Sequence, residues 1–250
     1  MELPTSDNPV TVVEGDALEG ISSLPDASID CIVTDPPYCA GGVSEASRVQ
    51  APGQGLRSET IRRFGWFTGD NMTTGGLVFL IRAVAFEACR VVKPTGSMVV
   101  FCDWRLSNTL APAIESAGLR FQDEIIWDKG SLGMGNGFRK QHEKALLFTF
   151  GSPKFHAADV PTVIRVPRVG KDDREHQTQK PVKLLRPILR VLCPVGGVVL
   201  DPFGGSGSTA VAAVAEDMKA VTFERDPAHC DTIRRRVADA MGTGLLAGIA

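Results

Sequence analysis

The stretch Ile29-Asp30-Cys31-Ile32-Val33-Thr34-Asp35-Pro36-Pro37-Tyr38 decides how the rest of the chain is interpreted. Its apolar half is typical of a buried β-strand, and the double proline ends that strand abruptly. Each proline fixes its own φ, and Pro36 also restricts the backbone of Asp35. The pattern predicts a stiff corner at a strand's carboxyl end, carrying a carboxylate and an aromatic ring. Taken alone, the same residues also fit an ordinary loop in which Asp35 is a cap.

A second short strand with a distinctive loop lies far downstream. The apolar run Val198-Val199-Leu200 leads into Asp201-Pro202-Phe203-Gly204-Gly205-Ser206-Gly207-Ser208-Thr209. The glycines permit a tight turn and a close approach of the backbone to a ligand. Ligands of open α/β sheets bind outside the carboxyl ends of the strands. We therefore expect both loops at one ligand-binding edge of one sheet.

With these two loops the sequence resembles the S-adenosylmethionine-dependent DNA amino-methyltransferases, which combine a DPPY-type catalytic loop with an FxGxG-type cofactor loop. The catalytic loop comes first and the cofactor loop last, which is similar to the circularly permuted beta group. The resemblance covers about residues 10–241. It implies one α/β domain over residues 1–250 with a Rossmann-like methyltransferase fold: a mostly parallel seven-stranded sheet, an antiparallel edge strand and helices on both faces.

The order of strands and helices agrees with this fold. Apolar and β-branched runs predict strands at 10–14, 29–34, 97–102, 121–127, 144–150, 198–200 and 220–224. Apolar residues at helical spacing predict helices at 17–24, 77–92, 107–117, 181–192, 208–216 and 227–241. The strands 121–127 and 144–150, joined through a glycine-rich loop, are expected to form an antiparallel hairpin at the edge of the sheet.

The resemblance assigns roles to single residues. Asp35 and the backbone carbonyl of Pro36 would accept hydrogen bonds from an exocyclic amine, and Tyr38 would stack on the base; the expected catalytic residues are Asp35, Pro36, Pro37 and Tyr38. The expected cofactor contacts are Asp16, Ala17, Asp35, Lys180, Asp201, Pro202, Phe203, Gly204, Gly205, Ser206, Gly207, Ser208, Thr209, Glu224 and Arg225.

Three of these cofactor contacts rest on separate observations. Glu224 ends the strand after the glycine loop, about 20 residues on, a position that suits a ribose diol. Asp16 also follows a strand, and capping the next helix is its ordinary alternative role. Residues 176–181 read His-Gln-Thr-Gln-Lys-Pro and resemble the family's HPTQKP segment, which implies that Lys180 lies near the cofactor's carboxylate; a plain helix start explains them as well.

The charge distribution favours a nucleic-acid partner more than the overall net charge of −2 does. Residues 139–190 hold 12 Lys/Arg and 5 Asp/Glu, a net of +7, whereas the remainder has a net of −9. Such a basic segment can present one positive face to phosphates, although a solvated surface has the same composition. The expected partner is double-stranded DNA, and the expected DNA contacts are Arg48, Arg57, Arg62, Arg63, Arg139, Lys140, Arg165, Arg168 and Lys171.

Two segments are expected to be loops with a function. Residues 39–76 contain eight glycines, four arginines and no clear periodicity, which predicts a flexible flap over the active site or a segment disordered in the free protein. The target-recognition region of the beta group falls at about residues 151–175. It is short here, so we expect a short or relaxed recognition sequence.

Several other classes of protein are disfavoured. The six cysteines are scattered without a CxxC pair, which indicates reduced thiols and no metal site. Residues 1–9 are polar and not a signal peptide, and no apolar stretch is long enough to span a bilayer. We expect a cytoplasmic, nucleoid-associated protein without a membrane partner. The resemblance also implies a homodimer, as in related beta-group enzymes.

The favoured function is methyl transfer from S-adenosylmethionine to the N6 amine of adenine in double-stranded DNA. In the family, DPPY accompanies adenine N6 more often and SPPY cytosine N4, so cytosine N4 remains the alternative. RNA or a protein glutamine is a less favoured substrate, because enzymes for those substrates more often have NPPY and the opposite order of loops. A nucleotide-binding oxidoreductase fits poorly because Gly204-Gly205-Ser206-Gly207 lacks the GxGxxG spacing. A DNA-binding module without catalysis is disfavoured by the intact Asp35 and Tyr38.

Overall fold

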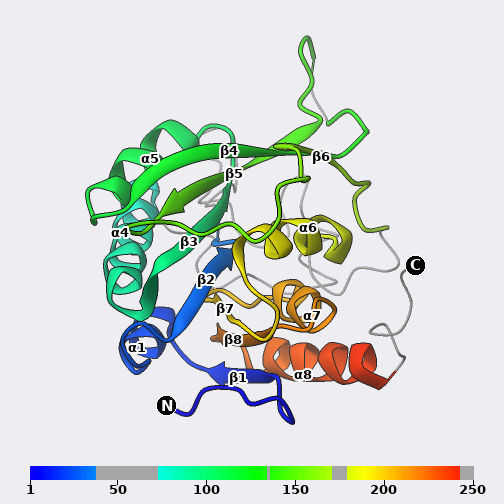
Figure 1. Ribbon diagram of the computed structural model, residues 1–250. Coiled ribbons are helices and arrows are strands. Elements are labelled where there is room, and N and C mark those ends of the chain that lie inside the picture. Colours follow the sequence, from blue (N-terminus) through cyan, green and yellow to red (C-terminus); the bar gives the residue numbers. More distant parts are fainter. Residues whose placement is uncertain (38–72, 134–135, 171–178, 243–250) are drawn as a thin grey trace.

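The computed structural model describes residues 1–37, 73–133, 136–170 and 179–242. Within them a single eight-stranded sheet organises the chain (Figure 1). Its strands are β1 (Val10–Glu14), β2 (Ile29–Thr34), β3 (Val92–Cys102), β4 (Arg120–Asp128), β5 (His142–Thr149), β6 (Val163–Arg165), β7 (Val198–Asp201) and β8 (Lys219–Glu224). The order is β1-β8-β7-β2-β3-β5-β4-β6, and only β5 runs antiparallel to its neighbours.

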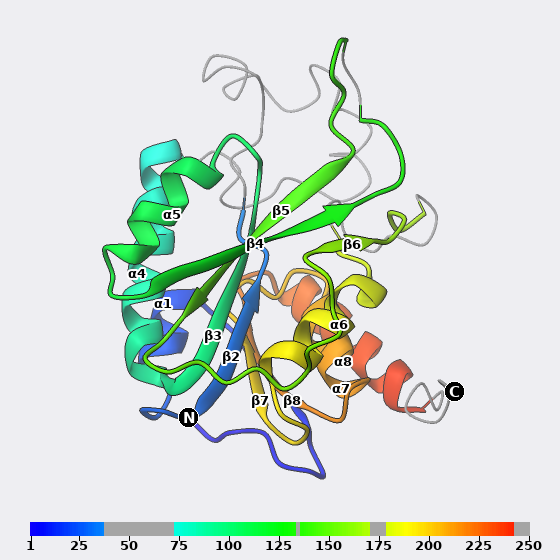
Figure 2. The ribbon, with the colours of Figure 1, turned by 45° about the horizontal axis from the view of Figure 1, so that its top comes forward.

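Helices cover both faces of this sheet (Figure 2). One layer is formed by α1 (Ala17–Ser22), α4 (Thr74–Val91) and α5 (Ser107–Glu115), and the other by α6 (Val182–Leu192), α7 (Ser208–Val214) and α8 (Pro227–Gly242). The central strands are apolar on both faces, because successive side chains alternate between the two layers. In β2, Ile32 packs into the first layer, whereas Cys31 and Val33 pack into the second.

The expected fold class is confirmed, but the sheet differs from the expectation in two details. The eighth strand, β6, pairs with β4 at residues 126–128 and lies inside the segment expected to be target-recognition loop. A strand of three residues is too short to show a two-residue periodicity in the sequence. Ile164 is buried between exposed Val163 and Arg165 because β6 pairs with β4. The expected antiparallel edge strand is wrong in its position, because β5 lies between β3 and β4.

The position of β5 has a simple physical reason. Residues 145–148 of β5 are all buried, so this strand needs neighbours on both sides and a helix layer on both faces. Much of β4, by contrast, is exposed at residues 120–123, which suits a strand nearer the end of the sheet. The expected hairpin of these two strands is confirmed by their antiparallel pairing.

The expected loop at 39–76 ends earlier than its glycines indicate. Thr73 Oγ1 accepts a 3.1 Å hydrogen bond from the Gly76 amide and caps α4, so residues 74–76 are helical despite two glycines. Residues 39–72 of the expected flap lie outside the described residues. Among the described helices, none is both long and apolar enough to cross a membrane.

Candidate active site

Four acidic residues meet at one edge of the sheet. Asp16 follows β1, Glu224 and Asp201 end β8 and β7, and Asp35 follows β2. These four strands are neighbours in the order β1-β8-β7-β2 and run parallel. Their carboxyl ends therefore lie side by side, and the two loops singled out in the sequence share one edge, as expected.

A buried hydrogen bond joins these two loops. Thr34 Oγ1, at the end of β2, donates to Asp201 Oδ1 at 2.8 Å, and the Phe203 amide donates to the same oxygen at 3.1 Å. Burial raises the pKa of Asp201 to about 7, although hydrogen bonds from Thr209 and Thr34 oppose that rise. Asp201 thus acts as a structural link between the strand of the DPPY corner and the glycine loop.

The glycine loop folds tightly over the end of β8. Gly205 and Gly207 have φ of +51° and +78°, a left-handed conformation that glycine adopts without strain. The Gly204 amide donates to the Phe223 carbonyl at 2.9 Å, and a Cβ at Gly204 would lie 3.0 Å from Ile233 Cδ1 and nearer still to Thr222 Oγ1. The close packing of Gly204 places the backbone of the loop directly on the strand end, immediately before α7.

Glu224 holds this loop by its side chain. Its Oε2 accepts a 2.8 Å hydrogen bond from the Gly205 amide, and its Oε1 accepts one of 2.9 Å from the Asp226 amide. Burial alone would raise the pKa of Glu224, but hydrogen bonds from His229 and these two amides lower it overall. Glu224 is therefore an ionised carboxylate at the loop.

The other expected cofactor contacts on this side differ in exposure. Asp16 Oδ1 accepts a 2.9 Å hydrogen bond from the Leu18 amide, so Asp16 does cap α1. Ala17 is buried in the first turn of α1, whereas Arg225 is exposed. The capping bond uses one carboxylate oxygen of Asp16, which leaves a contact to a ligand compatible with it.

The DPPY corner is anchored by a buried lysine. The Lys180 side chain is only 4% exposed, and its Nζ forms an ion pair with Asp35 Oδ2. The same Nζ lies 3.4 Å from Glu143 Oε2, and Glu143 Oε1 pairs with Lys129. Burial alone would lower the pKa of Lys180, but Asp35 and Glu143 raise it overall, so Lys180 is a stable cation. Alternating charges thus run from Asp35 through Lys180 and Glu143 to Lys129.

The comparisons with known proteins agree with this arrangement. A family model for DNA methylases of the N6/N4 amino-methyltransferase type matches residues 29–235, most of the chain. The chain belongs to this family. It is therefore a DNA methyltransferase of the adenine-N6 or cytosine-N4 kind, and the family takes its methyl group from S-adenosylmethionine.

Two curated relatives carry methylase or methyltransferase names. The protein named "Putative methylase YubD" of Escherichia coli (strain K12) is 27% identical over 212 residues, which cover 85% of this chain and 83% of YubD. The type II methyltransferase M.HpaI of Haemophilus parainfluenzae is 25% identical over 217 residues. That match covers 77% of this chain but only 62% of M.HpaI, so this chain spans less than two thirds of that relative.

Two solved structures have a fold similar to that of this chain. The cytosine-N4-specific PvuII DNA methyltransferase superposes with a TM-score of 0.71 at 18% identity, covering 97% of this chain and 94% of its own. The M1.HpyAVI–SAM complex superposes with a TM-score of 0.67 at 22% identity, covering 91% and 98%. At these identities the likeness shows the shared fold.

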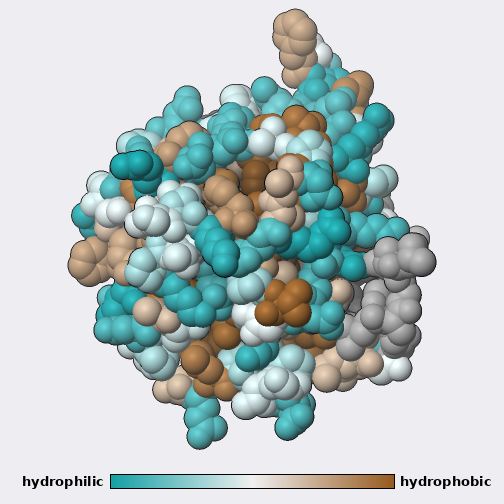
Figure 3. Space-filling view, viewed as in Figure 1, coloured by the Kyte–Doolittle hydropathy of each residue, from teal (hydrophilic) through white to brown (hydrophobic). Residues whose placement is uncertain are grey.

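The expected DNA contacts that the structure describes lie in the half of the sheet beyond β2. Arg139 and Lys140 lie on the β4–β5 loop, Arg165 ends β6 and Arg168 follows it; all four side chains are exposed. Figure 3 shows hydrophilic side chains over much of this region. Tyr38 and the remaining expected DNA contacts, Arg48, Arg57, Arg62, Arg63 and Lys171, lie outside the described residues.

Several residues of the methylase site were not expected from the sequence. Glu143 and Lys129 belong to the β4–β5 hairpin and reach Asp35 only through Lys180. Arg236 of α8 donates to the Ser206 carbonyl of the glycine loop. Arg236 follows the apolar Ile233 by three residues, a helical spacing that places it at the border of the buried side of α8. No comparable signal marks Glu143, because its partners come from distant segments.

Proposed function

We propose that this protein transfers a methyl group from S-adenosylmethionine to the N6 amine of adenine in double-stranded DNA. The observation that carries the proposal is Asp35, which follows β2 beside the glycine loop and is held by buried Lys180. The DPPY sequence favours adenine over cytosine. Cytosine N4 remains the second candidate, since both amines offer the same pair of N–H donors to Asp35 and Pro36.

The donor set at the strand ends fits the cofactor. S-adenosylmethionine supplies an electrophilic methyl group on a sulfonium cation, and it also carries a ribose diol and an adenine. The Asp201–Thr209 loop offers backbone amides at glycines where close approach is allowed, and Glu224 offers an ionised carboxylate for the ribose hydroxyls. Asp16, with Ala17 beside it, would face the adenine. Lys180 would add a positive charge between this half of the site and Asp35.

Asp35 would increase the reactivity of the exocyclic amine of the target base, which is a poor nucleophile. The lone pair of an exocyclic amine is delocalised into the base, so the amine needs acceptors for its N–H groups and a carboxylate near the charge that develops on it. Asp35 supplies the carboxylate, and the Pro36 carbonyl supplies a second acceptor fixed by two prolines. Lys180 restrains Asp35 Oδ2, so that the orientation of the carboxylate is set before the base arrives. Such positioning provides much of the rate in a reaction of this kind.

The target base must leave the helix before Asp35 can reach it. A base inside a duplex is inaccessible, and enzymes that modify bases rotate the nucleotide outward. The exposed basic residues Arg139, Lys140, Arg165 and Arg168 would bind the phosphates on either side of that base. A protein with this activity would act inside the cell, and the homodimer stays a prediction.

Nucleoside mass spectrometry tests this function. Duplex DNA is incubated with the protein and isotope-labelled S-adenosylmethionine, digested and searched for labelled N6-methyladenine and N4-methylcytosine. Asp35→Ala should abolish transfer and leave cofactor binding nearly intact, because Asp35 contacts the base and not the nucleoside part of the cofactor. Asp26→Ala, which removes an exposed carboxylate paired with Arg90, is the control and should be fully active. Label found only in RNA or protein, or full activity of Asp35→Ala, would contradict the proposal.

A further inference from the structure

The loop between β4 and β5 follows the carboxyl end of β4, and it projects from the edge of the sheet at which β2 ends (Figure 1). It carries Phe138, whose side chain is fully exposed. A large aromatic ring is normally buried, because its transfer out of water is favourable. The described residues leave this ring exposed, so the position of Phe138 suits contact with a partner molecule.

Hydrogen bonds hold the two sides of this loop together. The Lys129 amide donates to the Gln141 carbonyl at 2.9 Å, and the Gly133 amide donates to the Lys140 carbonyl at 2.7 Å. Arg139 Nε donates to the Gly133 carbonyl at 2.6 Å. A Cβ at Gly133 would lie 2.6 Å from the Lys140 carbonyl oxygen, so the two limbs approach as closely as glycine allows. The loop therefore holds Phe138 away from the body of the protein.

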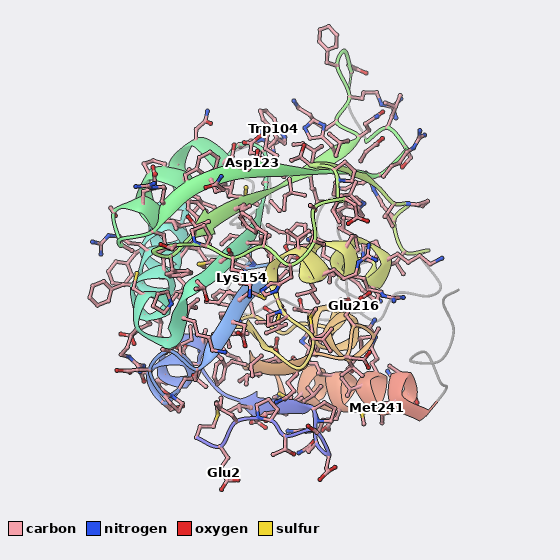
Figure 4. The ribbon with its side chains drawn as sticks, viewed as in Figure 1. Glu2, Trp104, Asp123, Lys154, Glu216 and Met241 are labelled. Carbon is pink, nitrogen blue, oxygen red and sulfur yellow. The ribbon has the colours of Figure 1, made fainter. Side chains whose placement is uncertain are left out.

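A cationic aromatic cluster lies at the base of the loop. Trp104 follows β3 at the same edge and is 41% exposed. Lys140 Nζ lies 4.5 Å from the centroid of its ring, and Arg105 Cζ lies 4.7 Å from it. Both distances are within the range of cation–π attraction. Figure 4 shows Trp104 on the side of the molecule from which the loop projects.

We propose that Trp104, Arg105, Phe138, Arg139 and Lys140 form a surface that grips duplex DNA, with the Phe138 ring inserted into the base stack beside the target base. Apolar wedges such as phenylalanine unstack base steps in DNA that is deformed by its protein, and flanking cations fix the register on the phosphates. This inference rests on the proposed function, because a wedge lowers the cost of moving the target base toward Asp35.

The order of the sheet supports this placement. β2, which carries Asp35, stands between β7-β8-β1 with the acidic and glycine-rich loops and β3-β5-β4 with the cationic aromatic surface. A ligand held by the first half and a duplex held by the second would meet at Asp35. The cations around Phe138 favour a phosphate backbone over an apolar protein surface; a second copy of this chain is the alternative occupant that the experiment distinguishes.

The test compares Phe138→Ala with the native protein on two duplexes, once the methylated sequence has been mapped. In one duplex the target base is paired, and in the other it faces an abasic site and is already destabilised. Phe86→Ala is the control, since Phe86 is another exposed phenylalanine, on α4 (61%). We expect Phe138→Ala to lower kcat/KM about tenfold to 100-fold on the paired duplex, with most of the loss recovered on the abasic duplex.

Two further measurements separate the parts of the proposal. The emission of 2-aminopurine at the target position should rise when the native protein and S-adenosylhomocysteine bind, and rise less with Phe138→Ala. Lys140→Gln should reduce the slope of log affinity against log salt by about 0.9, as expected for one lost phosphate contact. Phe86→Ala should match the native protein in every assay.

The outcomes are distinct. If the native protein methylates DNA and Phe138→Ala matches it on the paired duplex, or is equally impaired on both duplexes, the wedge is wrong and the proposed function stands. If Phe138→Ala instead disrupts a dimer seen by sedimentation without affecting flipping, Phe138 contacts a second copy. If the native protein methylates no DNA, the proposed function fails and this inference fails with it.

Discussion

Thr34 Oγ1 donates a 2.8 Å hydrogen bond to Asp201 Oδ1, across 167 residues of sequence. Thr34 is the last residue of β2, and Asp201 is the last residue of β7. The bond joins the strand that carries the DPPY corner to the strand that carries the glycine loop. Both side chains are buried, so the link is shielded from water and fixes the spacing of the two loops.

The protonation of Asp201 should make stability depend on pH. Its folded pKa of about 7 lies above the ordinary value of 3.8, so the folded state binds the proton more tightly than the unfolded state. Stability contributed by this group is present at low pH and is lost as pH rises from about 4 to about 7. Asp201→Asn keeps an acceptor for Thr34 and removes the titration.

Urea unfolding at about pH 5 and about pH 8 measures this effect. We expect Asp201→Asn to be more stable than the native protein by about 2 kcal/mol at the lower pH and by up to about 4 kcal/mol at the higher. Asp231→Asn, on a side chain that is 79% exposed, is the control and should follow the native protein at both. An Asp201→Asn variant with the native pH dependence would show that Asp201 is not the titrating group.

Glu143 should act on methyl transfer as a positioning residue. Glu143→Gln removes one of the two carboxylates that raise the pKa of Lys180, which loosens the restraint on Asp35 Oδ2. We expect kcat to fall about tenfold or more with little change in KM for the cofactor. The reason is that Lys180 and Glu143 position Asp35, which contacts the target base and not the cofactor. The alkaline limb of the pH–rate profile should move to lower pH as the pKa of Lys180 falls.

Glu124→Gln is the matched control for this prediction. Glu124 pairs with Lys144 at 2.8 Å on the same hairpin. Both side chains are partly exposed, and this pair is not part of the ion-pair chain that reaches Asp35 through Lys180. Such a pair contributes about 1 kcal/mol or less to stability. If Glu143→Gln and Glu124→Gln have the same activity and the same pH–rate profile, Glu143 has no role in positioning Asp35.

The glycine loop should not tolerate a side chain at Gly204. In Gly204→Ala the added Cβ would meet Thr222 Oγ1 and lie 3.0 Å from Ile233 Cδ1, so neighbouring groups must shift. We expect a loss of about 1–3 kcal/mol of unfolding free energy, read from chemical denaturation. Gly242→Ala, with no atom within 4 Å of the added Cβ, should change stability by less than about 0.5 kcal/mol.

Glu224 should contribute to cofactor affinity through its charge. Glu224→Gln retains an oxygen for the Gly205 amide, loses the second acceptor that the Asp226 amide uses, and loses the charge, so hydroxyl recognition weakens while the glycine loop keeps its bond to this side chain. Calorimetry with S-adenosylhomocysteine should show an affinity about tenfold weaker, or about 1.4 kcal/mol. Asp226→Asn, at the adjacent exposed acid that caps α8, is the control and should bind normally. Equal affinities for both variants would exclude this role.

The recognition sequence should be short or relaxed. The described part of the segment between β5 and α6 contains only the three-residue strand β6 and irregular chain over residues 151–170. Few side chains are available there for contacts with base edges, and each base pair read requires such contacts. Single-molecule sequencing of DNA from cells that express the protein would reveal the modified sites. Modification confined to one motif of about six or more base pairs would contradict this prediction.

The sequence by itself determined the class of fold and the edge at which the site lies. Two buried strands, one ending in Asp35-Pro36-Pro37 and one in the Asp201–Gly207 loop, predicted that both loops lie at one edge, because parallel strands in one sheet share their carboxyl edge, and the structure confirms that the two strands are parallel. Glu224 and Asp16 follow by the same rule. These inferences depend on the local hydrophobic pattern of each strand and on the loop that follows it, and both can be read from the sequence.

The tertiary structure alone decided which side chains touch within that edge. The pairing of Lys180 with Asp35 and Glu143, and of Thr34 with Asp201, depends on the lateral order and register of strands distant in the chain. The insertion of β5 between β3 and β4 brings Glu143 within reach of Lys180, and no local pattern encodes that order. Local sequence specifies the secondary structure of each segment. Contacts between segments depend on the arrangement of strands and helices that buries the apolar faces of all segments together, and only the tertiary structure shows that arrangement.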